Sequence, residues 1–258
     1  MITFGPIPSR RLGRSLGINN IPPKVCSYSC VYCQVGRTMK LQLERQKFYN
    51  PMQIFREVQA KMRKLRKEGE SVDFLSFVPD GEPTLDIKLG HEIELLRFLG
   101  IKIAVFTNSS LLWREDVRKD LTRADWVSLK IDSVDERIWR KVDRSHKLLR
   151  LSLIVEGIRD FAENYKGELV TETMLIKGLN DHWLHAEALA VLFSYLKPQK
   201  AYISIPTRPP AESWVQPPDE TSINDFYQTL KKGVKHVEYL IGYEGNAFAH
   251  TGELRMIS

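Results

Sequence analysis

The stretch CSYSCVYC places cysteines at positions 26, 30 and 33, and the chain of 258 residues contains no other cysteine. Two prolines just upstream, Pro22 and Pro23, disfavour a helix here, so the three thiols can turn toward a common centre. A four-iron cluster is normally held by four cysteine thiolates. Three thiolates leave one iron without a protein ligand, and this spacing therefore indicates a cluster whose open iron binds something else.

Three other interpretations of the cysteines remain open. A zinc site needs a fourth ligand, usually close in sequence, and the nearest histidine is His91. Buried structural cysteines are common, although this loop is otherwise polar. A redox pair formed by Cys30 and Cys33 leaves Cys26 unexplained. A non-catalytic protein that binds zinc or an iron–sulfur cluster is therefore an alternative to an enzyme.

The elements that position the cysteine loop follow a repeated pattern. Short apolar runs rich in β-branched residues occur at 72–78, 101–107, 126–132, 168–176 and 200–205. Amphipathic helical patterns lie between them, at 51–69, 91–100, 113–124, 148–165 and 182–196. We expect a further strand near Leu16–Asn20, before the cysteine loop, and another within 236–245.

This alternation predicts an α/β fold with a parallel sheet covered by helices, in a single domain over residues 1–258. The sheet is either open and doubly wound or a complete or partial barrel. In each case ligands bind at the carboxyl ends of the strands. The cysteine loop follows the first predicted strand, so it lies at that end.

Polar turns follow the next two strands. In PDGEPT (79–84), Gly81 allows a close backbone approach and Glu82 can pair with an ammonium group. The alternative is an ordinary strand-to-helix turn, in which Pro83 lies near the start of the next helix. In TNSS (107–110), Thr107 and Asn108 either line the mouth of the site or cap the next helix. Both turns are predicted to face the cysteine loop.

The later strands extend this polar rim. Ser128, Lys130 and Asp132 alternate onto one face, which is unusual for a buried strand of a parallel sheet. Glu172 in the fifth strand and Thr207 just after the sixth extend the same rim. Arg208, beside three prolines, is a candidate substrate clamp, although most arginines of this kind lie on the surface.

Composition adds broad limits. The formal net charge is +6, which permits an anionic partner such as RNA or a phosphorylated metabolite without requiring one. No run of about 18 apolar residues is present, the N-terminus lacks the apolar region of a secretory signal, and the few cysteines favour a reducing cytoplasm. The basic residues of 61–67 are typical of a solvated helix face, whereas Arg10, Arg11 and Arg14 lie near the predicted site.

The cysteine motif resembles the C-x3-C-x-aromatic-C signature of the radical S-adenosylmethionine (radical SAM) enzymes. The resemblance implies a partial (β/α)6, TIM-barrel-like fold with a short C-terminal strand, in which Cys26, Cys30 and Cys33 hold one [4Fe–4S] cluster. The open iron would bind SAM, with Tyr32 against its adenine. GEP at 81–83 is similar to the G-G-E-P motif that engages the methionine amino group, although Asp80 stands where the family usually has glycine.

The resemblance also assigns SAM-binding roles to strand-end residues. Groups that bind the ribose and the carboxylate of SAM are expected at Ser128, Lys130 and Asp132, with Thr107, Asn108, Glu172 and Thr207 along the same rim. A cytoplasmic electron donor such as flavodoxin or ferredoxin would reduce the cluster. SAM is then cleaved to methionine and a 5′-deoxyadenosyl radical, which abstracts hydrogen from a substrate. The activity is that of an oxidoreductase.

Seven segments, among them GPIPSRRLGRSLGIN, MLIKGLND, TRPPAESWV and YEGNAFA, together resemble the Fe–S oxidoreductases related to the wyosine-base synthases of tRNA-Phe. Those synthases carry extra upstream cysteines for a second cluster. The present chain has no cysteine outside the 26–33 loop, so these residues hold no second thiolate-bound cluster. The substrate is therefore expected to be either a tRNA base or a small metabolite or cofactor precursor.

Overall fold

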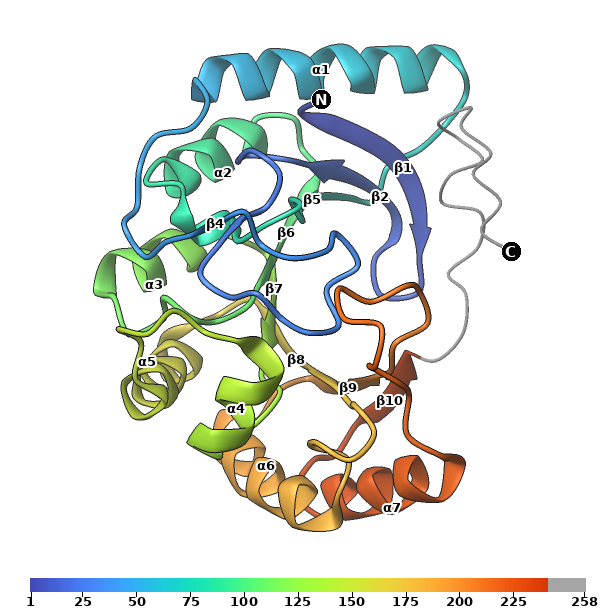
Figure 1. The fold of residues 1–258 in the computed structure, drawn as a ribbon. Coiled ribbons are helices and arrows are strands. Elements are labelled where there is room, and N and C mark those ends of the chain that lie inside the picture. The colour runs from blue at the N-terminus through green and yellow to red at the C-terminus, as the bar shows by residue number, and fades with distance from the viewer. Residues whose placement is uncertain (241–258) are drawn as a thin grey trace.

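The computed structural model describes residues 1–240. Eight strands form one sheet in the order β1-β2-β5-β6-β7-β8-β9-β10 (Figure 1). Their bounds are β1 Thr3–Ser9, β2 Gly13–Ile18, β5 Phe74–Phe77, β6 Lys102–Thr107, β7 Trp126–Lys130, β8 Glu168–Met174, β9 Lys200–Ser204 and β10 Val237–Leu240. β1 pairs with β2 antiparallel and every other neighbour pairs in parallel. The prediction of a partial (β/α)6 barrel with a short C-terminal strand is confirmed.

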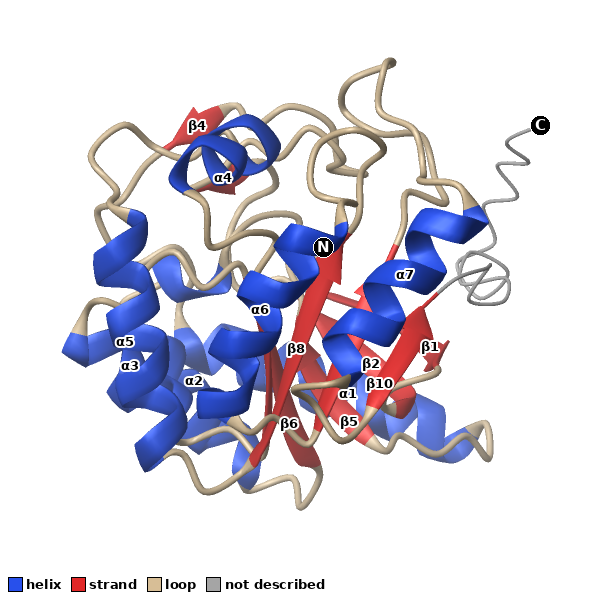
Figure 2. Cartoon of the chain, turned by 90° about the horizontal axis from the view of Figure 1, so that it is seen from below, coloured by secondary structure: helices blue, strands red, loops and turns tan. Residues whose placement is uncertain are grey.

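Helices cover the outside of this sheet (Figure 2). They are α1 Pro51–Lys67, α2 Leu89–Arg97, α3 Glu115–Leu121, α4 Glu136–Asp143, α5 Leu151–Asn164, α6 Trp183–Leu196 and α7 Glu220–Lys231, with a 3₁₀ turn η1 Pro83–Leu85. α1 begins as its sequence predicts, because Asn50 accepts a hydrogen bond from the amide of Met52 and Pro51 occupies the first turn. No helix within residues 1–240 is both long and apolar enough to cross a bilayer.

Two elements of the barrel differ from the sequence prediction. The first barrel strand begins earlier than Leu16, and it has an antiparallel partner, β1, that the sequence did not predict. β1 contains Pro6 and Pro8, and it can do so because it is an edge strand and needs few backbone donors. Helices α4 and α7 were also missed. The predicted strand at 236–245 forms as β10 up to Leu240, and its remainder, like YEGNAFA, lies outside the described residues.

The two faces of the barrel strands have different partners. One face, which includes Leu75, Val127 and Ile203, packs in the main core beneath the helices. On the other face Ala104, Trp126, Val170 and Tyr202 form a separate apolar cluster around Leu12. Leu12 comes from the turn of the β1–β2 hairpin. The hairpin turn therefore fills the interior of the barrel below the polar rim.

Long loops, helix α4 and the short pair β3 Val25–Cys26 and β4 Lys40–Leu41 gather at one end of the sheet (Figure 2). The β3–β4 pair belongs to the loop that follows β2, so this end carries the carboxyl ends of the parallel strands. It is the end at which ligands bind in folds of this kind. The cysteines are therefore at the predicted position.

Candidate active site

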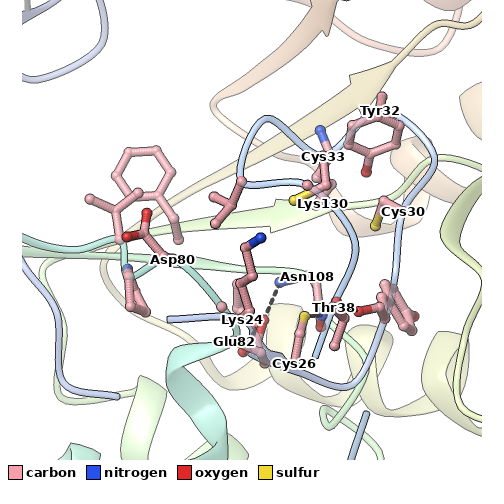
Figure 3. A pocket seen from close by; sticks show the side chains of 18 of the residues that line it. Lys24, Cys26, Cys30, Tyr32, Cys33, Thr38, Asp80, Glu82, Asn108 and Lys130 are labelled. Atoms are coloured by element: carbon pink, nitrogen blue, oxygen red, sulfur yellow. Dashed lines mark hydrogen bonds between the residues drawn. The ribbon is translucent and has the colours of Figure 1, made fainter. Parts of the chain in front are cut away.

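A cavity of about 210 Å³ opens at the carboxyl ends of the strands. Its lining includes the following predicted site residues: Cys26, Cys30, Cys33, Tyr32, Gly81, Glu82, Thr107, Asn108, Ser128, Lys130 and Glu172. Figure 3 shows the three cysteine sulfurs around one open space, with Lys24 and Asn108 also facing it. Pro83, Asp132 and Thr207 are not part of this lining. Residues from four strand ends and the cysteine loop thus meet in one pocket.

The cysteine loop is fastened to helix α4. The amides of Ser29 and Val31 donate to the carbonyls of Asp143 and Val142, and the Cys30 thiol donates to Asp143 Oδ1 at 3.3 Å. α4 ends at Asp143, so the last residue of this helix holds the centre of the loop. Sequence reasoning missed Asp143 because it missed α4. No local signal joins two residues 113 positions apart.

Burial is the main influence on the pKa values of the three cysteine thiols. It raises the pKa of Cys26 to about 12, with the carboxylate of Glu82 adding to the effect. Burial and then Asp143 hold the pKa of Cys30 well above its usual range, and burial raises that of Cys33. The thiolate forms needed to bind iron are therefore favoured only when positive metal charge is present.

The donor set and its surroundings fit an iron–sulfur cluster better than a single ion. Among residues 1–240, no three Cys, His, Asp or Glu side chains are arranged to ligate one metal ion. The three thiols instead lie around a cavity, as a cluster of several irons requires, and all three are free of disulfides. The side-chain Nδ2 of Asn108 donates to Cys26 Sγ at 3.4 Å, and such contacts tune bound sulfur.

Glu82 is held rigidly beside the cysteines. The side chain is buried and Oε1 accepts from the amide and hydroxyl of Thr84 and from Thr107 Oγ1, while Oε2 accepts from the Asn108 amide at 2.7 Å. Burial nevertheless raises its pKa. Pro83 is buried in η1, and its carbonyl accepts from Asn20. The GEP segment is therefore a fixed wall of the pocket.

Gly81 allows this wall to touch the cysteine loop. A Cβ at Gly81 would lie 2.1 Å from the Val25 carbonyl oxygen and 2.8 Å from Ile21 Cδ1. In the structure the close approach that Gly81 permits is therefore to the cysteine loop. The Glu82 amide donates to the same Val25 carbonyl at 3.1 Å.

We expect Gly81→Ala to displace the segment carrying Cys26, to lower the free energy of unfolding by about 1–3 kcal/mol, and to reduce the iron bound per chain after anaerobic reconstitution. Gly100→Ala is the matched control. Gly100 has a φ of +71° and open space around it, so alanine there costs about 1–2 kcal/mol of backbone strain without touching the cysteine loop. Equal iron content in Gly81→Ala and Gly100→Ala would contradict the role of Gly81 in positioning the segment that carries Cys26.

Strand β7 supplies two side chains to the pocket, and the third predicted one lies behind it. Ser128 and Lys130 line the cavity. The carboxylate of Asp132 is buried, accepting from the Tyr32 hydroxyl and, at 2.7 Å, from the Met174 amide. Asp132 therefore fixes Tyr32, whose ring lies 5.0 Å from Lys130 Nζ.

An ion cluster forms the far wall of the cavity. Glu172 pairs with Lys130 Nζ at 3.2 Å and with Arg11 Nη1 at 2.5 Å. Burial alone would raise the pKa of Glu172, but the two cations hold it at about 2. Burial lowers the pKa of Lys130, and Asp132 and Glu172 outweigh this to raise it. This wall is therefore ionised at neutral pH.

Arg11 reaches this wall from the hairpin turn, across 161 residues of sequence. Its guanidinium lies over the rings of Phe106 and Tyr202, at 4.7 and 5.9 Å. The sequence pointed to Arg11 only as part of a basic cluster. Thr207 lies in a different, neighbouring pocket together with Arg11 and Arg208.

The chain matches the radical SAM superfamily over residues 20–189, which is more than half of its length. It belongs to that superfamily and is a radical SAM enzyme. Membership implies a [4Fe–4S] cluster and SAM. The chain is also 49% identical over 249 residues to the UPF0026 protein MJ1312 of Methanocaldococcus jannaschii, covering 96% of this chain and 77% of that protein. It therefore belongs to the UPF0026 family as well.

Solved structures share the fold. A radical SAM methyltransferase from Sphaerobacter thermophilus superposes with a TM-score of 0.63 at 18% identity, covering 90% of this chain and 69% of that one. TYW1 with a lysine–pyruvate adduct bound gives a TM-score of 0.59 at 16% identity, covering 87% and 76%. At these identities the likeness shows the fold alone.

Proposed function

We propose that this chain carries one [4Fe–4S] cluster on Cys26, Cys30 and Cys33, binds SAM in the adjoining cavity, and uses it to abstract hydrogen from a small polar molecule. The observation that carries the proposal is that three free thiols and the ordered polar groups of four strand ends line one pocket. When bound, the cluster supplies the electron that splits the sulfonium C–S bond of SAM, leaving methionine and a 5′-deoxyadenosyl radical.

The residues of the pocket suit the parts of SAM. Glu82 Oε2 accepts only one hydrogen bond within the described residues, from Asn108, and so has capacity left for an ammonium group. Lys130 offers a cation for a carboxylate, and the Tyr32 ring offers a flat apolar face for adenine. Ser128 offers a hydroxyl for hydrogen bonding to the ribose. Asp132 acts indirectly, because its hydrogen bond positions Tyr32.

The small-molecule substrate is favoured by the shape of the site. The cavity is compact, and an ion cluster of Arg11, Glu172 and Lys130 forms one of its walls. The lack of further cysteines in these residues also removes the second thiolate-bound cluster of the wyosine-base synthases. A small metabolite or cofactor precursor fits such a site.

A tRNA base is the second candidate. It is supported by the resemblance to the wyosine-base synthases and by the formal net charge of +6. RNA binding through basic side chains would weaken steeply as salt is raised. A tRNA titration that detects no salt-dependent binding removes this candidate.

We expect anaerobically reconstituted protein to bind iron and sulfide and to convert SAM to 5′-deoxyadenosine when dithionite is added, as measured by liquid chromatography. Reduced flavodoxin or ferredoxin should replace dithionite if either class of protein is the physiological donor. Zinc in place of iron and sulfide in anaerobically purified protein, together with no 5′-deoxyadenosine, would support the non-catalytic metal-binding alternative and overturn the proposal.

A further inference from the structure

Lys24 lies two residues before Cys26 and lines the same cavity as the cysteines. Figure 3 shows its side chain directed into the space that the cysteine sulfurs surround. Its Nζ lies 3.4 Å from the point that a Cβ on Gly36 would occupy, so the ammonium group reaches the segment that follows Cys33. The side chain therefore extends from one end of the cysteine loop to the other across the cavity.

The backbone of Lys24 has a conformation that few residues other than glycine adopt. Its φ is +61°, in the left-handed region. Its amide donates to the Asp80 carbonyl at 2.6 Å, and its carbonyl accepts from the amides of Met39 and Lys40 at 3.0 and 3.1 Å. Left-handed residues persist where the surrounding structure fixes them, and they cluster at ligand-binding sites. The three hydrogen bonds fix the point from which the Lys24 side chain enters the cavity.

The cavity lining offers two lysines to an anionic group, and they differ in their partners. Lys130 Nζ lies 3.2 Å from a carboxylate oxygen of Glu172 and 3.9 Å from one of Asp132, so its charge is already balanced. The ammonium group of Lys24 makes no hydrogen bond or ion pair with any side chain of residues 1–240. An unpaired cation that faces a cavity attracts an anionic group of a ligand, and a charge-assisted hydrogen bond between them is strong.

Lys24 and the buried carboxylate of Glu82 belong to two segments that are bonded to each other. Besides the bond from the Lys24 amide to Asp80, the Glu82 amide donates to the Val25 carbonyl at 3.1 Å. Within residues 1–240, Glu82 Oε2 accepts one hydrogen bond, from the amide of Asn108, and no ion pair joins Glu82 to Lys24. A cation and a carboxylate held side by side without pairing suit a ligand that carries an ammonium and a carboxylate on one carbon, as an α-amino acid does.

We propose that Lys24 binds the carboxylate of the methionine moiety of SAM, while Glu82 binds its ammonium group. The assignment rests on the function proposed above, because SAM is the amino-acid ligand of that function. Lys130 then stays with Glu172 in the ion cluster of the far wall. The two residues act as a clamp that selects a ligand with both charges, so adenosine compounds that lack the carboxylate lose the contact with Lys24.

Calorimetric titration of the anaerobically reconstituted protein with SAM and with decarboxylated SAM, which lacks only the carboxylate, tests the assignment. We expect Lys24→Gln to weaken the binding of SAM about tenfold, equal to about 1.4 kcal/mol, and to leave the binding of decarboxylated SAM unchanged. Lys24→Arg keeps the positive charge and should recover part of the affinity for SAM. Lys40→Gln is the matched control, because Lys40 is exposed, lies in β4 beside Lys24 and does not line the cavity.

Equal weakening of both ligands by Lys24→Gln would overturn the assignment, because Lys24 would then act on the fold or the cluster and not on the carboxylate. An affinity of Lys24→Gln for SAM that matches that of Lys40→Gln would overturn it as well. Calorimetry gives the dissociation constant separately from the fraction of chains that bind, so incomplete loading with iron lowers the stoichiometry and leaves the comparison intact. If the wild-type protein binds no SAM, the proposed function fails together with the assignment. If the wild type cleaves SAM and Lys24→Gln binds it equally well, only the assignment fails.

Discussion

Cys30→Ala is expected to abolish SAM cleavage. With one of three thiolates removed, the cluster loses a ligand that no other cysteine of this chain can replace. We expect 5′-deoxyadenosine formation to fall at least about 1000-fold, equivalent to about 4 kcal/mol of lost stabilisation, and iron per chain to fall with it. Chromatography of the product and iron analysis of the reconstituted variant measure both.

A purely structural role for Cys30 makes a different prediction. Its thiol donates to Asp143 Oδ1, a weak hydrogen bond, and its side chain lines the cavity. The apoprotein of Cys30→Ala should therefore melt close to the wild-type apoprotein, as should that of Arg137→Gln, a control at a side chain that is 88% exposed. A variant that loses stability as apoprotein but retains iron and cleavage would show that Cys30 is not a cluster ligand.

The sequence predicted the parts of the site that lie within short motifs. CSYSCVYC and PDGEPT each follow a predicted strand and the alternating SLKID ends one, and the strand rhythm placed all three at one end of the sheet. Because parallel strands end at the same edge, the motifs were expected to meet, and residues from each of them line one cavity. Local patterning was sufficient here.

The sequence did not predict the residues that orient those motifs. Arg11 reaches the barrel interior because it lies in the turn of the β1–β2 hairpin, which was not predicted from the sequence. Asp143 lies at the end of a helix that was not predicted. The place of Asp132 behind Tyr32 also depends on strand register across the barrel. Such contacts join distant segments and leave no local periodicity.

A buried carboxyl pair beneath η1 should make the protein less stable as pH rises. Glu92 of α2 and Asp86 after η1 are both buried, and neither oxygen of Glu92 has a hydrogen-bond partner within residues 1–240. Burial and then the neighbouring Asp86 raise the pKa of Glu92 to about 9, and burial raises that of Asp86 to about 6. The folded chain therefore holds protons that the unfolded chain releases.

The direction of the effect follows from these two pKa values. Both are raised by folding, so their contribution to stability is complete below about pH 4 and is lost as pH rises through about 6 and then about 9. A tenfold difference in proton affinity between the folded and unfolded chains corresponds to about 1.4 kcal/mol, so the loss amounts to several kcal/mol.

Glu92→Gln should remove most of this dependence, because glutamine has nearly the same shape and no charge to bury. We expect the variant to exceed wild type in Tm by roughly 5–15 °C at pH 8.5, at about 2–4 °C per kcal/mol, and to differ little at pH 5. Glu94→Gln is the matched control, since Glu94 lies on the exposed side of α2 in a solvent-facing pair with Arg123. Parallel pH profiles for wild type and Glu92→Gln would mean that Glu92 is ionised in the folded protein. Wild type and Glu94→Gln should instead lose stability together as pH rises while Glu92→Gln loses much less, because Glu92, unlike the exposed Glu94, binds a proton that unfolding releases.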